Sequence, residues 1–319
     1  MKLLQSFRLS TGVIVLLGLI LGSCQNKTTA SEKELALNGA DSGIAEVKAE
    51  PKPLSREFKK YWYAGNAEIT SYKLEQARYG ELREGTSVLI YVTEPFLPDA
   101  QVKADGNNAN NVPVLKLNAT KKYLTGIYPY SIMSSTFYPV GDHQHAIKTS
   151  LSMQEWCGHI YAQLNNREQF DYTAHSYFEG EADTQSSLPK ALLENEIWNK
   201  IRIDPQGLPT GAITIIPALE FFRLKHREIG AYDATARLTT EEGISTYTLE
   251  YEGGIRKLEI QFTSAFPHTI EGWTEEFMSG YGSNAKVLRS TGTKMKRLIS
   301  PYWRQNSNEF LPLRDSLGL

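Results

Sequence analysis

An alternation of apolar and polar residues with a period of two runs through most of the chain and constrains its fold more than any other feature. It is clearest over residues 68–79, 87–93, 245–251 and 257–263, where the apolar side chains fall on every second position. This spacing is typical of strands that bury one face. We therefore expect a mainly β protein of the β-rich α+β type, built on a large antiparallel sheet.

Turn signals between these segments predict hairpins. Residues 80–85 are few enough to connect 68–79 to 87–93, and Gly253-Gly254 is a strong hairpin signal between 245–251 and 257–263. The aromatic run 123–133 reads as a single strand, with Pro129 placing it at an edge or a bulge. Further strands are expected at 112–117, 146–153, 159–164, 170–178, 221–226, 232–239, 269–277 and 285–298.

One helix is expected near 188–201. Ser187 offers a cap, Pro189 suits a first helical turn, and apolar residues including Ile197 and Ile201 recur at helical spacing. With so many strands and one amphipathic helix, we expect the sheet to be strongly curved, or folded into an open barrel, with the helix packed on it.

The amino-terminal residues indicate where the protein resides. Lys2 and Arg8 precede an apolar run at 13–21, which is shorter than the roughly 20 residues that a membrane-spanning helix requires. The run ends in Leu21-Gly22-Ser23-Cys24, which resembles the bacterial lipobox. That resemblance implies a signal peptide over 1–23 and a mature chain that is acylated at Cys24.

The segment that follows has a different composition from the rest of the chain. Residues 24–54 are rich in Ala, Ser, Thr, Asn, Lys and Glu and have few side chains to bury, so we expect a flexible tether that precedes a single β-rich domain at 55–319. Gln25 stands where an Asp marks inner-membrane retention in Gram-negative lipoproteins. We therefore expect an outer-membrane protein that is anchored by lipid and faces the periplasm.

Charge and motif content narrow the possible functions. The formal net charge is −2, whereas nucleic-acid-binding proteins usually carry a basic excess, so we expect no nucleic-acid partner. The sequence contains no phosphate-binding glycine loop, no nucleophile-elbow serine motif and no His-Glu-x-x-His metalloprotease motif. We assign no cofactor.

A few local patterns have possible chemical roles. Cys157 and His159 are two residues apart and would share one face of a strand, as a nucleophile and its base would; a structural cysteine is the alternative. His143 and His145 would both reach one metal ion if extended, but no third ligand follows at a convincing spacing, so we assign no metal site. The acidic residues at 179–183 are expected to turn a hairpin.

Longer segments resemble a lipoprotein family of Bacteroidota that has no assigned function. The resemblance rests on 71–85, 150–159 and 266–273 and spans most of 58–319. Members are sometimes labelled "septum formation inhibitor Maf", although the Maf nucleotide pyrophosphatases carry a Ser-Pro-Arg-Arg loop. Here the only Ser-Pro is Ser300-Pro301, followed by Tyr302. The strand pattern also resembles the curved-sheet architecture of several envelope lipoproteins and lipoprotein carriers.

Two functional hypotheses follow. The first is a non-enzymatic binding or assembly protein, held at the membrane through its amino-terminal lipid, whose sheet-lined groove takes an apolar ligand or an envelope protein. The second is a cell-envelope hydrolase or transferase that uses Cys157 and a histidine such as His159. We favour the first because no catalytic motif is present.

Overall fold

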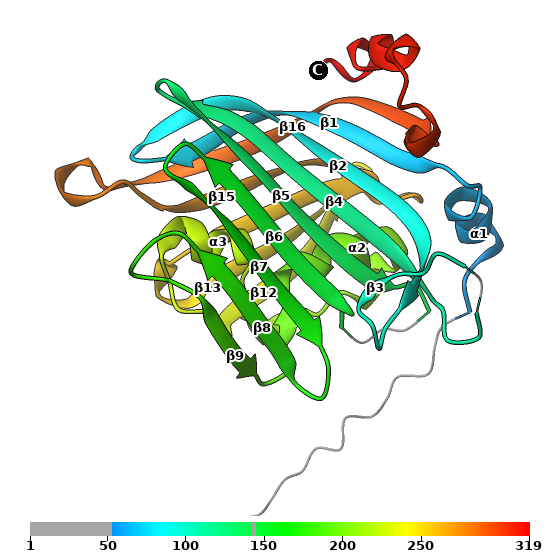
Figure 1. Ribbon diagram of the computed structural model, residues 1–319, viewed down its shortest axis with the longest axis horizontal. Coiled ribbons are helices and arrows are strands. Elements are labelled where there is room, and N and C mark those ends of the chain that lie inside the picture. Colours follow the sequence, from blue (N-terminus) through cyan, green and yellow to red (C-terminus); the bar gives the residue numbers. More distant parts are fainter. Residues whose placement is uncertain (1–52, 107, 142–144) are drawn as a thin grey trace, which may run out of the picture. The chain divides into compact units, whose positions relative to one another are not determined.

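The computed structural model describes residues 53–106, 108–141 and 145–319, and it confirms the β-rich fold class. These residues belong to one compact unit that is built on a single open sheet (Figure 1). The predicted signal peptide, Cys24 and nearly all of the predicted tether lie outside the described residues. The strands are β1 (Ala67–Arg78), β2 (Glu81–Leu97), β3 (Val102–Lys103), β4 (Val112–Thr125), β5 (Tyr128–Pro139), β6 (Lys148–Glu155), β7 (Gly158–Asn166), β8 (Phe170–Ser176), β9 (Thr184–Leu188), β10 (Leu192–Leu193), β11 (Gly211–Ile216), β12 (Tyr232–Glu241), β13 (Ile244–Tyr251), β14 (Lys257–Thr263), β15 (Ile270–Ser279) and β16 (Lys286–Ser300).

Two meanders of sequentially adjacent strands make up this sheet. The strand order is β10-β11-β12-β13-β14-β15-β16-β1-β2-β4-β5-β6-β7-β8-β9, and β3 pairs with β2 beside this path. All pairs are antiparallel except β10 with β11. The first and last long strands, β1 and β16, pair with each other and join the two meanders. The two edges, β9 and β10, are separated in sequence by only three residues, 189–191.

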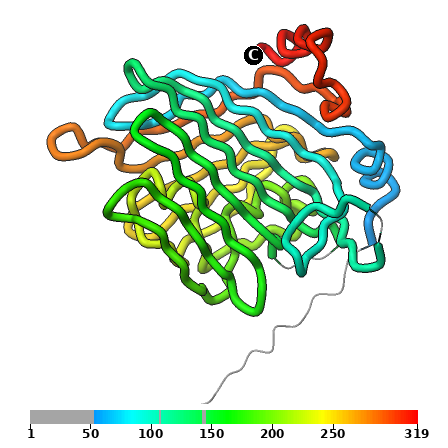
Figure 2. The backbone as a smooth tube through the Cα atoms, viewed as in Figure 1, coloured from blue at the N-terminus to red at the C-terminus, as the bar shows by residue number. Residues whose placement is uncertain are grey.

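Among the described residues, three α-helices accompany the sheet: α1 (Arg56–Trp62), α2 (Glu194–Ile203) and α3 (Leu219–Lys225). Short 3-10 helices occur at Pro205–Gly207, Glu252–Gly254, Gly282–Asn284, Tyr302–Arg304, Asn308–Leu313 and Asp315–Leu317. Figures 1 and 2 show the strands curving around α2 and α3. The largest apolar cluster joins Ile197 of α2 and Leu224 of α3 to side chains from both meanders, such as Leu117 and Leu258.

The predicted helix is present, but it begins later than its sequence suggests. Leu192 and Leu193 remain extended as β10 and pair in parallel with β11, so α2 starts only at Glu194. Arg202 then fastens α2 to β1: its Nη1 and Nη2 donate to the two carboxylate oxygens of Glu68 at 2.7 and 2.8 Å, and both side chains are buried. Burial raises the pKa of Glu68, but the Arg202 guanidinium outweighs it and holds that pKa below its usual value.

Two strand predictions are wrong. The segment expected as a strand at 221–226 is the helix α3. Its side chains Phe221, Phe222 and Leu224 are all buried although two of them are consecutive, which a helix packed on several sides allows. The aromatic run 123–133 is two strands, because Gly126, with φ of +61°, turns the chain between β4 and β5.

The predicted hairpins are confirmed. β1 and β2 pair in antiparallel register with Arg78 opposite Glu81, so the turn is only Tyr79-Gly80, shorter than the 80–85 connection expected. Both turn residues have positive φ, as a type I′ turn requires. β13 and β14 pair across the Gly253-Gly254 turn, and the acidic segment 179–183 connects β8 to β9.

Candidate functional site

Within the part of the chain that the structure describes, α3 separates a larger and a smaller cavity inside the curved sheet. The larger has a volume of about 490 Å³ and contacts Leu219, Phe222 and Arg223 of α3. The smaller has a volume of about 70 Å³ and contacts Glu220, Phe221 and Leu224 on other sides of the same helix. Because both cavities share one seven-residue wall, the contacts that fix α3 also fix the shape of each cavity.

The larger cavity is lined mainly by apolar side chains of the inner sheet face. Leu151, Ile160, Ala162 and Ala174 come from three successive strands, β6 to β8, and are all buried. These residues point inward because successive side chains of a strand alternate between its two faces. The exposed part of the lining comes from the β8–β9 loop and from residues 226–228 after α3. The cavity therefore opens to solvent beside that loop.

A polar group of three side chains stands at this opening. Arg223 Nη1 lies 2.8 Å from Glu181 Oε1, and His226 Nδ1 lies 2.7 Å from the same oxygen. The Arg223 guanidinium packs on the ring of Phe178 at 4.5 Å, and its buried Nε has no hydrogen-bond partner in the described structure. An apolar cavity with an ion-paired polar group at its mouth suits an amphiphile whose polar group remains near solvent.

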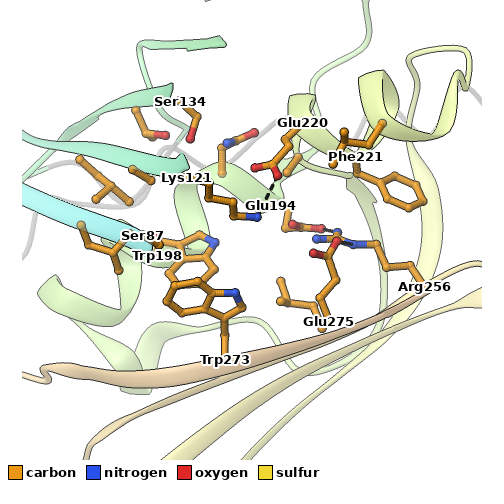
Figure 3. A pocket seen from close by; sticks show the side chains of 18 of the residues that line it. Ser87, Lys121, Ser134, Glu194, Trp198, Glu220, Phe221, Arg256, Trp273 and Glu275 are labelled. Atoms are coloured by element: carbon orange, nitrogen blue, oxygen red, sulfur yellow. Dashed lines mark hydrogen bonds and ion pairs between the residues drawn. The ribbon is translucent and has the colours of Figure 1, made fainter. Parts of the chain in front are cut away.

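The smaller cavity is lined by charged and aromatic side chains together (Figure 3). Lys121 of β4 donates to Glu220 of α3 at 2.8 Å. Across the cavity, Arg256 lies between two buried carboxylates: its Nε is 2.6 Å from Glu275 Oε1, and its Nη1 donates to Glu194 of α2. The rings of Trp198 and Trp273 pack edge to face beside these groups.

Opposite charges keep these buried groups ionised. Burial lowers the pKa of Lys121, but Glu220 and Glu275 outweigh burial and raise that pKa above its usual value. Burial raises the pKa of Glu275, but Arg256 and Lys121 outweigh it and hold that pKa below its usual value. The two cations thus offset most of the charge of the three carboxylates across a space for only a few water molecules, and these ion pairs fasten both α2 and α3 to the sheet.

The Cys157–His159 pair predicted from sequence lies outside both cavities. Cys157 is exposed in the turn between β6 and β7, and His159 is exposed on β7. Cys157 is therefore in a turn and not within a strand. Its neighbour Glu155 raises the pKa of the thiol by hydrogen bonding and by charge, which disfavours the thiolate that a nucleophile needs. The side-chain interactions that shift the pKa of the thiol are with Glu155, and His159 is not among them.

The histidines considered for a metal do not form a site within the described ranges. His143 and Cys24, the residue predicted to be acylated, both lie outside them. His145 Nδ1 lies 3.1 Å from the buried Glu196, whose other oxygen accepts from the Ala146 backbone at 2.7 Å. Among the residues that the structure describes, no three His, Cys, Asp or Glu side chains are placed to hold a metal ion.

The site residues that sequence reasoning missed are far apart in the chain. Lys121, Glu220 and Arg256 belong to β4, α3 and the β13–β14 connection, and only the folded sheet brings them together. Arg223 and His226 are not part of any sequence motif, and the strand expected at 221–226 did not indicate that they would meet Glu181. The acidic run at 179–183 was noted, but its partners were not.

Comparisons with known proteins add no assignment. The chain matches no family model, and searches of curated proteins and of solved structures gave no match. Within the described ranges, none of the helices has the length and the apolar character needed to cross a membrane.

Proposed function

We propose that this protein is a non-enzymatic binding protein of the cell envelope that takes an apolar or amphiphilic molecule into the larger cavity. The observation that carries the proposal is a space of about 490 Å³ inside the sheet, lined mainly by apolar side chains and open beside the β8–β9 loop. Small-molecule sites in proteins commonly have volumes of about 300–1,000 Å³. Each methylene group that a ligand buries there contributes about 0.8 kcal/mol to binding.

The position of the polar groups supports binding over catalysis. The buried ionisable side chains around Arg256 are paired with one another and line the smaller cavity. The exposed thiol of Cys157 has a raised pKa and is separated from both cavities. The larger cavity thus offers an apolar volume and one polar end, as a carrier site does.

The amino-terminal sequence supplies the location in this proposal. Acylation at Cys24 anchors the chain to the outer membrane on its periplasmic side, and residues 24–54 link the anchor to the binding domain. Metabolic labelling with a palmitate analogue tests this point. Label is expected in the wild type and not in Cys24→Ala, and equal label in both would refute the anchor without affecting the cavity proposal.

A fluorescent fatty acid tests the cavity directly. Ala174 lies on the inner face of β8 and lines the larger cavity, so Ala174→Phe is expected to reduce fatty-acid binding at least tenfold by filling the space. His175 is the next residue and is exposed on the outer face, so His175→Phe is the matched control and is expected to bind as the wild type does. Equal binding by both variants would contradict the cavity proposal.

A further inference from the structure

Within the described residues, six hairpin turns lie at one end of the sheet; the β13–β14 turn carries the exposed Glu252, and the other five carry exposed apolar side chains. These five connect β15 to β16, β1 to β2, β4 to β5, β6 to β7 and β8 to β9, and the pairs are consecutive in the strand order. Antiparallel pairing places all five turns at the same end, at the left of Figures 1 and 2. We call this feature the apolar rim, and it consists of Tyr79, Leu124, Ile127, Trp156, Tyr177 and Tyr281.

The rim side chains are exceptionally exposed. Among the described residues, the four most exposed large hydrophobic side chains are Ile127 at 79%, Tyr177 at 74%, Trp156 at 69% and Tyr281 at 63%, and all four belong to the rim. Single exposed hydrophobic residues are ordinary on protein surfaces, but a row of them on successive turns marks a contact surface.

Contacts between neighbouring tips make the rim one surface. Tyr128 and Trp156 bring the β4–β5 and β6–β7 tips together, with ring centroids 6.5 Å apart. The ring of Tyr177 lies so close to Gly158 that a Cβ there would be 2.8 Å from it. Tyr79, on the β1–β2 tip, shares a hydrogen bond of 2.8 Å with the hydroxyl of Tyr130 in β5. The tips therefore support one another and do not project independently.

The rim is also poor in charge. Residues 79–80, 125–127, 156–157 and 280–285 include no Asp, Glu, Lys or Arg, and only the β8–β9 loop carries acidic residues. The turns at the opposite end are different, with Asp99 and Asp105 before β4 and Arg167 and Glu168 between β7 and β8. The turn residues of four of the five rim tips are thus uncharged, and the charged side chains nearest to them, such as Glu81 and Glu155, belong to the ends of the strands.

We propose that the apolar rim docks on the surface of a lipid bilayer. Trp and Tyr favour the interface between lipid and water because each ring combines an apolar body with one polar group. Adjacent hairpins are about 10 Å apart, so the five tips form a row about 40 Å long that is only one turn wide. A long, narrow row of apolar turns fits an extended lipid surface, whereas a protein partner needs a broader complementary patch.

The chain can reach a bilayer with this end even when it is anchored at Cys24. The described domain begins at α1, which lies at the end of the sheet away from the rim in Figure 1. Pro53 follows Cys24 by 29 positions, and such a segment spans at most roughly 100 Å. The longest strand, β2, has 17 residues and spans about 56 Å. The linking segment is therefore longer than the distance it must cover.

Docking would place the mouth of the larger cavity at the membrane. The β8–β9 loop carries Tyr177 of the rim and also Gly180 and Ala182 of the cavity lining. An apolar molecule could then pass between lipid and cavity beside this loop with little exposure to water. The docking proposal itself stands on the rim alone and does not require a bound ligand.

Cys157 provides a probe at the rim. The full chain is labelled at Cys157 with a fluorophore and reconstituted in phosphatidylethanolamine–phosphatidylglycerol vesicles. Quenching of the fluorophore is then measured with a nitroxide on the lipid acyl chain and, separately, with aqueous iodide. We expect the acyl-chain nitroxide to quench the label severalfold more than it quenches a label on Glu168→Cys, made in a Cys157→Ser background. Cys157→Ser alone measures any label taken up by Cys24.

A variant pair completes the test. The double variant Ile127→Asp with Tyr281→Asp is expected to remove at least half of the nitroxide quenching. Its binding of the fatty acid is expected to remain, which shows that the cavity is intact and that only docking is lost. The matched control, Val102→Asp with Leu311→Asp, changes two exposed apolar residues outside the rim and is expected to retain the quenching. Equal nitroxide quenching at Cys157 and at Glu168→Cys would overturn the proposal. A rim that docks on a protein instead of on lipid would give this result.

Discussion

The two cavities on either side of α3 differ in their lining and in their volume. The smaller one is bordered by buried charges that hold helices on the sheet, and its volume of about 70 Å³ leaves little room for anything but water. The larger one, about 490 Å³, has few such fastenings and an apolar lining. The difference indicates that stability resides on one side of α3 and ligand capacity on the other.

The largest expected effect comes from breaking the charge cluster at the smaller cavity. Arg256→Met leaves Glu194 and Glu275 buried without their cation, and this is expected to lower the free energy of unfolding by about 3–5 kcal/mol. Urea denaturation measures this loss in the free energy of unfolding. The control is Arg237→Met, an exposed arginine 3.8 Å from Glu250, with an expected change of less than about 1 kcal/mol. Similar losses in the two variants would contradict the comparison.

Adding the same side chain to each cavity sharpens the contrast. Ala119 lines the smaller cavity and Ala174 the larger. Ala119→Phe is expected to cost about 1–3 kcal/mol because it crowds packed groups, whereas Ala174→Phe has space and is expected to cost less than about 1 kcal/mol. Thermal and urea unfolding of the two variants provide the measurement. A larger loss for Ala174→Phe would show that the larger cavity is not available space.

Acid should weaken the charged side selectively. The pKa of Glu275 is below its usual value of 4.5, so its contribution is fully present above that value and is lost as the pH falls through the lower, folded-state pKa. Each unit by which the pKa is lowered corresponds to about 1.4 kcal/mol. Urea unfolding between pH 6 and pH 3, roughly the range of carboxylate titration, should show a shallower decline for Glu275→Gln than for the wild type. Parallel curves would argue against this assignment.

The smallest effect is expected at the residues that first attracted chemical interest. Cys157→Ser and His159→Ala alter exposed side chains outside both cavities, so the free energy of unfolding should change by less than about 0.5 kcal/mol. Fatty-acid binding should also be unchanged. A clear loss of binding in either variant would revive the hypothesis of a site built on the thiol.

Local patterns in the sequence predicted most of the sheet because strands and turns leave local signals. The alternation at 245–263 with its Gly253-Gly254 turn is an example, and the structure confirms that hairpin. The prediction failed where one residue or one tertiary environment decided the outcome. Gly126 alone divides the run 123–133, and α3 is too short for its helical period to be distinguished from a buried strand.

The candidate site was much less predictable than the fold. Lys121 is separated from Glu220 and Arg256 by about a hundred residues or more, and their contacts depend on the curvature of the whole sheet. Cys157 and His159, in contrast, formed a visible local pattern that the fold places on an exposed turn. Closeness in sequence identified residues with reactive chemistry, but it carried no information about burial.

The pairing of β1 with β16 constrains when the domain can complete its folding. Tyr72 is opposite Lys294 in this pair, so 222 positions of chain separate two residues that are neighbours in the middle of the sheet. The amino-terminal meander can form its own hairpins as it emerges during synthesis or export, but β1 keeps one free edge until the last strand arrives. A chain that lost β16 would retain two half-sheets, each with an unprotected edge and a tendency to aggregate.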